Sequence, residues 1–191
     1  MNQEILFATH NRGKLEEARN YLSPLGYLVY GLDDLFLSEE VVEDGKSYEE
    51  NAYKKAKAFE SLPFPVFSDD SGLEVEALGG KPGLFTARFA YEKGGYKEAM
   101  AALAQATEGN PRARYVCTIC LLEKGQKKPL FFTGVCEGEI LKEPVGDRGF
   151  GFDPAFKSKE GVYFGLASQE EKAKVSHRGR ALLKLATYLA I

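Results

Sequence analysis

Two kinds of apolar pattern alternate along this chain, and their order restricts the folds that it can adopt. Strand-type runs lie at residues 5–8, 66–67, 73–77, 113–122 and 130–137. Helix-type spacing lies at residues 14–22, 47–59, 96–107 and from 176 onward. The first strands are separated by helices, which requires crossovers, whereas the last two flank a loop at Gly125, as in a hairpin. Both kinds of connection in one chain predict an α/β fold with a mixed sheet.

The chain has 191 residues, enough for a substantial core, and contains no repeat, low-complexity tract or long linker. We therefore expect residues 1–191 to form a single domain, either one core or two intimate lobes that divide near the middle of the sequence. The spacings Ser47 to Glu50 and Ser168 to Glu171 are capping boxes, which predict where two helices begin. A turn is expected at residues 68–71, after the short strand-type run.

Charge and hydropathy exclude several classes of partner. Lys and Arg total 25 against 28 for Asp and Glu, so the formal charge of −3 argues against a strongly basic nucleic-acid binder. No apolar run approaches the roughly 18 residues that a membrane-spanning helix needs. Residues 1–7 lack the basic region and cleavage site of a secretory signal. We therefore expect a cytoplasmic protein that binds neither membranes nor nucleic acid.

The three cysteines are Cys117, Cys120 and Cys136, an odd number that argues against a disulfide framework. Cys117 and Cys120 have the spacing of a zinc knuckle, but they lie in a strand-type run, where residues three apart point to opposite faces. Small core residues in a reducing compartment are the favoured interpretation.

The polar segment after the first strand-type run contains groups that suit a phosphate. Short polar side chains and a lysine lie at the start of a helix, whose first backbone N–H groups attract anions. The P-loop pattern is absent, and an ordinary capped turn explains the same residues. The residues concerned are Thr9, His10, Asn11, Arg12, Gly13 and Lys14.

Two adjacent carboxylates follow the strand-type run that ends at Phe67. Asp69 and Asp70 are costly there unless a cation neutralises them, and Mg²⁺ binds carboxylate oxygens together with water and phosphate. One carboxylate can hold the metal while the other takes a proton from water. Glu43 could add a ligand, and Lys55 could reach a phosphate. A solvated Asp-Asp-Ser-Gly turn and a charged helix face are the simpler explanations.

Two further segments suit a nucleoside base. Residues 149–154 combine glycines, which let a backbone approach a planar ligand, with two phenylalanines that can stack on a base. His177 and Arg178 lie at a helix start, with Lys172 in the preceding turn, and an arginine fork suits a carbonyl or a phosphate. An aromatic turn and a capped helix start explain them as well. Together these segments provide cations for a polyphosphate, carboxylates for Mg²⁺ and an aromatic loop for a base, which are the groups that a nucleotide pyrophosphohydrolase needs.

The same segments make the chain resemble the inosine triphosphate pyrophosphatase family, the Ham1-like pyrophosphatases of non-standard purine triphosphates. The matching blocks appear in order over nearly the whole chain, at residues 8–14, 43–56, 68–73, 80–88, 149–154 and 176–182. The resemblance implies a two-lobed α/β fold with a long central mixed sheet flanked by helices and an active-site cleft between the lobes. It also implies a Mg²⁺-dependent homodimer that hydrolyses ITP, dITP and XTP to the monophosphate and pyrophosphate, keeping deaminated purines out of DNA and RNA.

The resemblance further implies a role for each matching residue. Asp70 is expected to be the general base, and Glu43, Asp69 and Asp70 are expected to hold the metal. Expected substrate contacts are Thr9, His10, Asn11, Arg12, Gly13, Lys14, Lys55, Ser71, Phe150, Gly151, Phe152, Asp153, Lys172, His177 and Arg178. The chain departs from the family pattern where Val42 replaces an acidic residue, Phe152 replaces a tyrosine and Tyr91 replaces a glycine.

Three alternatives remain open at this point. A related Maf-like enzyme would prefer pyrimidine triphosphates, and the Ser-His-Arg block argues against it. A nucleotide sensor would bind without hydrolysis, and the pair Asp69 and Asp70 argues against that. A module that stacks RNA or DNA bases on its phenylalanines is opposed by the acidic charge balance.

Overall fold

The computed structural model describes residues 3–191, and by its internal contacts the chain divides into two compact units. Unit 1 comprises the chain up to Asp70 together with residues 117–133 and 181–191, and unit 2 comprises residues 71–116 and 134–180. A single division near the middle of the sequence is therefore wrong. The boundaries fall inside three long strands and one helix, because a ten-residue strand runs for about 33 Å and can contribute to two cores.

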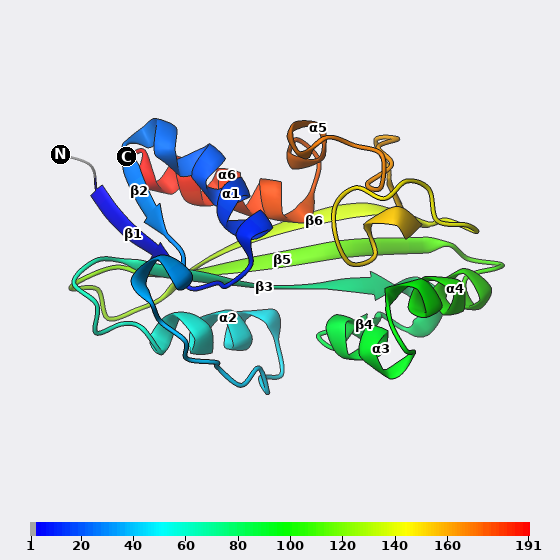
Figure 1. Ribbon diagram of the computed structural model, residues 1–191, viewed down its shortest axis with the longest axis horizontal. Coiled ribbons are helices and arrows are strands. Elements are labelled where there is room, and N and C mark those ends of the chain that lie inside the picture. The colour runs from blue at the N-terminus through cyan, green and yellow to red at the C-terminus, as the bar shows by residue number, and fades with distance from the viewer. Residues whose placement is uncertain (1–2) are drawn as a thin grey trace. The chain divides into compact units, whose positions relative to one another are not determined.

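One seven-stranded sheet is formed by the described residues, in the order β2-β1-β3-β5-β6-β7, with β4 paired to β3 (Figure 1). Its strands are β1 (Gln3–Phe7), β2 (Tyr27–Tyr30), β3 (Val66–Val75), β4 (Lys81–Gly83), β5 (Arg112–Leu122), β6 (Leu130–Ile140) and β7 (Phe156–Ser158). Strand β1 pairs in parallel with β2 and β3, whereas β4 is antiparallel to β3 and β7 is antiparallel to β6. The predicted mixed sheet is confirmed.

Six α-helices accompany the sheet within residues 3–191: α1 (Arg12–Leu22), α2 (Tyr48–Lys57), α3 (Thr86–Glu92), α4 (Tyr96–Ala106), α5 (Gln169–Ala173) and α6 (His177–Leu189). Short 3-10 turns lie at η1 (Ser23–Leu25), η2 (Asp33–Leu35), η3 (Glu76–Leu78) and η4 (Asp153–Ala155). None of the helices in the described part of the chain is long and apolar enough to cross a membrane.

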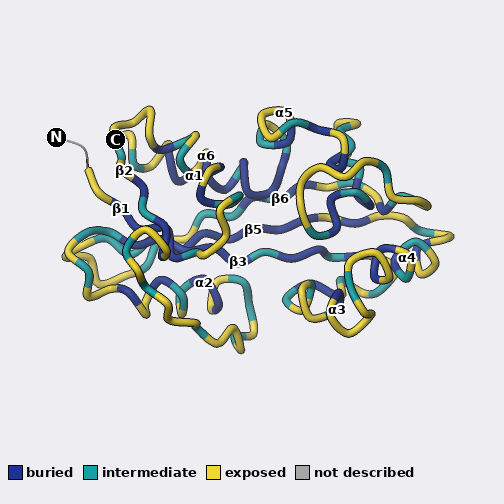
Figure 2. Tube along the Cα trace, viewed as in Figure 1, coloured by how far each residue is buried: buried dark blue, intermediate teal, exposed yellow. Residues whose placement is uncertain are grey.

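The strands of unit 1 are covered on both faces. Helix α1 and the C-terminal part of α6 lie on one face, and α2 lies on the other (Figure 1). Because side chains alternate along a strand, Ile5 and Phe7 of β1 pack with α1 and α6, while Leu6 packs with α2. The ring of Phe7 stacks on that of Phe67 in β3, with centroids 4.5 Å apart. The middle of the unit 1 sheet is accordingly buried (Figure 2).

Unit 2 has a core of its own that is rich in aromatic rings. Leu73 of β3 and Leu103 of α4 belong to it. Tyr115 of β5 meets Phe156 edge-on at 4.7 Å and stacks in parallel with Phe164 at 5.9 Å, measured between ring centroids. These rings stabilise the core of unit 2, because each contacts another at a favoured aromatic geometry.

Several local predictions are confirmed and one is wrong. Ser47 and Ser168 cap α2 and α5, each accepting a hydrogen bond from a backbone N–H three residues on, at 3.1 Å. The three cysteines are buried, and no disulfide forms within the described residues. The turn expected at residues 68–71 does not exist, because β3 continues from Val66 to Val75 without a break. Pairing with β1 at one end and β4 at the other holds these polar residues extended.

Candidate active site

The segment that follows β1 is shaped by local hydrogen bonds. Asn11 caps α1, its Oδ1 accepting from the backbone N–H of Lys14 at 3.0 Å. Thr9 Oγ1 in turn accepts from the backbone N–H of Asn11 at 3.0 Å. Gly13 lies in the first turn of α1, so the predicted phosphate segment does end at a helix N-terminus, where a phosphate is electrostatically favoured.

The remaining side chains of this segment are exposed. His10 Nδ1 lies 2.7 Å from Asp33 Oδ1 at the surface of unit 1. Arg12 is exposed at the first position of α1. Both are available to a ligand that approaches the helix N-terminus.

Asp69 lies in β3 on the face that is covered by α1. Only 1% of the residue is exposed, and Lys14 Nζ lies 3.2 Å from its Oδ1. The thiol of Cys117 in β5 lies 3.8 Å from its Oδ2. The parallel pairing of β1 with β3 brings the start of α1 beside this carboxylate, which explains how residues 55 positions apart meet.

Asp70 points to the opposite face of β3, toward α2. Its Oδ2 accepts a hydrogen bond of 3.0 Å from the amide of Asn51, whose own oxygen accepts from the backbone N–H of Gly45 at 2.8 Å. Burial raises the pKa of Asp70 to about 6, and repulsion from Glu43 and Asp69 adds to that effect. Lys55 and the Asn51 hydrogen bond act in the opposite direction.

Lys55 interacts electrostatically with all three predicted metal ligands. Its Nζ lies 2.5 Å from Glu43 Oε1. Burial lowers the pKa of Lys55, but attraction to Asp69, Glu43 and Asp70 outweighs burial, so the net pKa is raised. We call Lys14, Glu43, Asn51, Lys55, Asp69 and Asp70 the unit 1 cluster.

The carboxylates of the unit 1 cluster fit a hard divalent cation. Asp70 is a buried carboxylate whose charge is opposed by burial and by two neighbouring carboxylates, and a cation would relieve both penalties. Within residues 3–191, no three His, Cys, Asp or Glu side chains lie close enough together to hold a metal ion on their own. Mg²⁺ is ordinarily held by one or two carboxylates together with water and phosphate oxygens.

The loop at residues 149–154 is organised around the carboxylate of Asp153. Its Oδ2 accepts from the backbone N–H of Phe150 at 3.0 Å and pairs with Lys172 Nζ at 2.6 Å, and both of these charged side chains are buried. Gly149 adopts a φ of +75°, and a Cβ there would lie 2.1 Å from Asp153 Oδ2. The close approach of this backbone therefore requires glycine.

Phe150 offers an exposed ring in unit 2. It is 43% exposed, with Lys172 Nζ 4.8 Å and the Arg178 guanidinium carbon 5.4 Å from its centroid. Arg178 also donates to Ser71 Oγ at 3.3 Å. Gly151 follows Phe150 in the same loop, also at positive φ. An exposed aromatic ring with two cations beside it suits a planar, electron-rich ligand.

Phe152 differs from Phe150, because its ring belongs to the core. It is only 2% exposed and meets the ring of Tyr96 edge-on at 5.1 Å. Of the two phenylalanines expected to stack on a base, only Phe150 therefore presents an exposed ring, while Phe152 anchors the loop.

Two functional candidates were missed by reasoning from the sequence. Asn51 contacts Asp70 directly, and its only sequence signal is its place in the block that matches the family. Tyr115 stacks on His177 with centroids 4.5 Å apart, and its hydroxyl lies 3.5 Å from Asp153 Oδ1. Burial and the neighbouring Asp153 carboxylate raise the pKa of Tyr115 well above 10. No motif marks this tyrosine. We call Tyr115, Phe150, Asp153, Lys172, His177 and Arg178 the unit 2 cluster.

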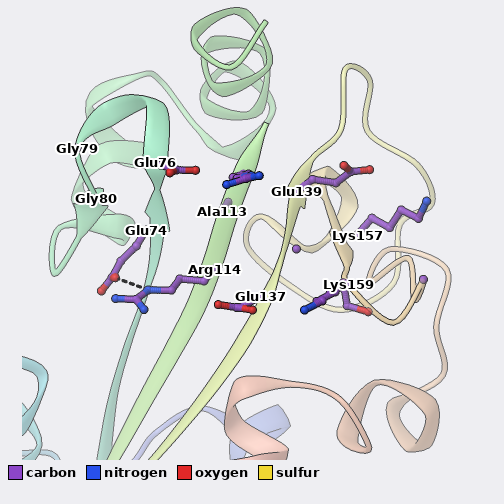
Figure 3. A pocket seen from close by; sticks show the side chains of 14 residues that line it. Glu74, Glu76, Gly79, Gly80, Ala113, Arg114, Glu137, Glu139, Lys157 and Lys159 are labelled. Carbon is purple, nitrogen blue, oxygen red and sulfur yellow. Dashed lines mark hydrogen bonds and ion pairs between the residues drawn. The ribbon is translucent and has the colours of Figure 1, made fainter. Parts of the chain in front are cut away.

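Unit 2 also contains a pocket of about 960 Å³, which none of the predicted site residues lines (Figure 3). Acidic and basic side chains are mixed on its walls, and Arg114 pairs with Glu74 at 2.8 Å. Its lining is Glu74, Glu76, Gly79, Gly80, Arg112, Ala113, Arg114, Glu137, Gly138, Glu139, Lys157, Ser158, Lys159 and Gly161.

Known proteins with similar sequences and structures cover nearly the whole chain. A relative from Syntrophobacter fumaroxidans, named dITP/XTP pyrophosphatase, is 44% identical over 95% of this chain and 79% of its own length. One of the same name from Bacillus subtilis is 38% identical over 98% of this chain and 97% of its own length.

Solved structures of Ham1 proteins superpose on the chain. The protein from Staphylococcus aureus matches with a TM-score of 0.85 at 34% identity, covering 98% of both chains. The one from Coxiella burnetii matches with a TM-score of 0.87 at 33% identity, again covering 98% of both. The sequence model of the Ham1 family matches residues 5–188. From its sequence, its fold and these matches, the chain belongs to the Ham1 family.

Proposed function

We propose that this protein hydrolyses non-standard purine nucleoside triphosphates, namely ITP, dITP and XTP, to the monophosphate and pyrophosphate. The observation that carries the proposal is Asp70, a buried carboxylate with a pKa of about 6 beside Lys55. Such a group is mostly deprotonated at pH 7 yet basic enough to accept a proton from water. The names of the relatives, dITP/XTP pyrophosphatases, support the same substrate class.

The unit 1 cluster would bind the triphosphate. Lys14, Lys55 and the N-terminus of α1 attract the phosphate oxygens, with Thr9, His10, Asn11, Arg12 and Gly13 around them. A Mg²⁺ ion held by Glu43, Asp69 and Asp70 would supply charge neutralisation at the phosphates.

Hydrolysis would proceed by attack of water on the α-phosphorus. Asp70 accepts the proton of the water while the new bond from oxygen to phosphorus forms. The bond from the α-phosphorus to the bridging oxygen breaks, and pyrophosphate leaves with that oxygen. Lys14 and Lys55 stabilise the charge that collects on the phosphate oxygens, which is the main source of catalysis in phosphoryl transfer.

The unit 2 cluster would bind the nucleoside. Phe150 stacks on the purine, and Arg178 donates to the 6-oxo group that hypoxanthine and xanthine share. Adenine carries an amine at that position. Its binding would place this amine opposite the Arg178 guanidinium, so that two donors face each other without an acceptor, and binding would lose roughly 1–3 kcal/mol of free energy. Lys172, Asp153 and His177 would hold Phe150 and Arg178 in position.

The biological role that follows is removal of deaminated purines before polymerases incorporate them into DNA or RNA. The proposal includes a homodimer that acts in the cytoplasm without a nucleic-acid partner. Sedimentation of the purified protein at micromolar concentration tests the dimer, and a mass of one chain would contradict it.

The decisive experiment measures pyrophosphate release from ITP, XTP, dITP, ATP, GTP and dTTP, each with Mg²⁺ and with EDTA. We expect release that depends on Mg²⁺ and is confined to ITP, XTP and dITP. Strong activity on dTTP would instead favour the pyrimidine specificity of Maf-like enzymes. Tight binding of ITP without release from any substrate would identify a nucleotide sensor and contradict the role of Asp70.

A further inference from the structure

The carboxylates assigned to the metal already have cationic partners. Lys14 Nζ lies 3.2 Å from Asp69 Oδ1, and Lys55 Nζ lies 2.5 Å from Glu43 Oε1. The lysine side chains are only 18% and 17% exposed and the Asp69 side chain is 2% exposed, whereas the Glu43 side chain is 45% exposed. The Lys14–Asp69 pair is therefore not a loose surface pair that solvent would screen, while the Lys55–Glu43 pair is open to solvent on the side of its carboxylate.

A lysine ammonium and a divalent cation compete for the same oxygens. Two positive charges a few ångströms apart repel strongly where water is largely excluded, and the ammonium already satisfies the carboxylate. The three carboxylates and two lysines of the unit 1 cluster carry a formal charge of only −1, because three negative charges face two positive ones. A bare divalent ion gains little from a cluster that is so nearly neutral.

We infer that Lys14 and Lys55 are the resident counter-ions of Asp69 and Glu43, and that a divalent cation binds there well only when a triphosphate draws both ammonium groups away. The inference rests on the proposed function and adds to it an order of events. Free metal is bound poorly, and the metal–triphosphate complex is bound well.

The exchange is physically feasible because each lysine has a second partner when the nucleotide is present. Lysine carries its charge on a flexible four-carbon stem, so its ammonium can move without moving the helix. Lys14 lies in the first turn of α1, where a phosphate is attracted by the helix N-terminus. Metal and triphosphate should therefore strengthen each other's binding, and by linkage that effect is reciprocal.

The test measures Mn²⁺ binding to the nucleotide-free protein by the electron paramagnetic resonance signal of free Mn²⁺. We expect Lys14→Gln and Lys55→Gln to bind Mn²⁺ about tenfold or more tightly than the wild type, because each removes one competing charge. Lys54→Gln is the matched control, since Lys54 lies next to Lys55 in α2 but pairs with the exposed Asp44. Its Mn²⁺ affinity should equal that of the wild type.

A double variant identifies the site that gains affinity. Adding Asp69→Asn to Lys14→Gln should abolish the gain, because the released carboxylate is then neutral. Tight Mn²⁺ binding by the nucleotide-free wild type, or unchanged affinity in both lysine variants, would overturn the inference. Circular dichroism confirms that each variant is folded. Pyrophosphate release by the wild type is measured separately, so a failure of the proposed function and a failure of this inference give different results.

Discussion

The amide of Asn51 donates a hydrogen bond of 3.0 Å to Oδ2 of Asp70 from the neighbouring helix α2. Its orientation is set by the backbone N–H of Gly45, which must face the amide oxygen and thus turns the amide nitrogen toward Asp70. A donor that faces a carboxylate stabilises its charged form and lowers its pKa. Asn51 therefore lowers the pKa of Asp70 while burial raises it, and the net pKa is about 6.

Replacement of Asn51 by Ala should move the acid limb of the pH profile for kcat/KM upward by about one unit or more, because a hydrogen bond to a charged group is lost. The shift is upward since Asp70 must be deprotonated to act, and its pKa rises without the donor. Asn20→Ala, at an exposed helical asparagine in α1, is the control. An unchanged acid limb in Asn51→Ala would show that this amide does not tune Asp70.

The variant Asp70→Asn should lower kcat on ITP by roughly 10² or more while the fold is retained, because the general base is removed. The neutral side chain keeps nearly the same shape and can still accept from Asn51. Steady-state pyrophosphate release with saturating Mg²⁺ measures the effect, and circular dichroism reports the fold. Normal turnover would rule out the role of Asp70.

The same variant should be more stable than the wild type at neutral pH when EDTA is present. The pKa of Asp70 is raised from its usual 3.8 to about 6, so the folded protein holds a proton that the unfolded chain releases. The wild type therefore loses stability as the pH rises from about 4 to 6, by about 2 kcal/mol, and Asp70→Asn lacks that loss. Urea unfolding at pH 4 and pH 7 should show a gain only at pH 7.

The buried pair of Lys172 and Asp153 makes a separate prediction. Lys172→Met should lower the free energy of unfolding by about 3–5 kcal/mol, because it leaves the Asp153 carboxylate buried without its cation. Lys174→Met, at an exposed lysine two residues on, should change it by less than about 0.5 kcal/mol. Urea midpoints compare the two. Equal midpoints would mean that the pair contributes nothing to stability.

Two glycines at positive φ, Gly149 and Gly125, allow the effect of backbone strain to be distinguished from an effect on the geometry of the site. Gly125→Ala should cost about 1 kcal/mol of stability, since its φ is +80°, and Gly149→Ala should cost at least as much, since its φ is +75°. A Cβ at Gly149 would also meet Asp153 Oδ2 at 2.1 Å, whereas nothing lies within 4 Å of one at Gly125. Only Gly149→Ala should raise the KM for ITP, and by about tenfold, because it displaces the carboxylate that holds the loop. Equal KM values in the two variants would contradict this.

The sequence predicts those features that depend on a few neighbouring residues. Ser47 and Ser168 cap their helices as expected, because a cap needs only a side chain and a backbone N–H three residues away. The polar segment before α1 ends at the helix N-terminus for the same reason. The family blocks also marked Asp69 and Asp70, although the cleft between lobes, the metal and the dimer remain predictions.

Local patterns fail where distant strands decide the outcome. Residues 68–71 have the composition of a turn, yet they are extended because β1 and β4 pair with β3 on either side of them. The boundaries of the two units also could not be found from local patterns, since they fall inside long strands.

By itself the sequence determined the mixed α/β class, the starts of the capped helices α2 and α5, and the chemistry of the polar segments, but it did not predict helix α3. Only the tertiary structure decided which of those groups act together. Asn51 reaches Asp70 because helix α2 packs against the face of β3 that carries Asp70. Phe150 rather than Phe152 presents an exposed ring because the ring of Phe152 is packed in the core of unit 2. An ion pair between α1 and β3 likewise brings together Lys14 and Asp69, which lie 55 positions apart in the sequence. Such contacts depend on folding of the whole chain, so no window of residues contains them.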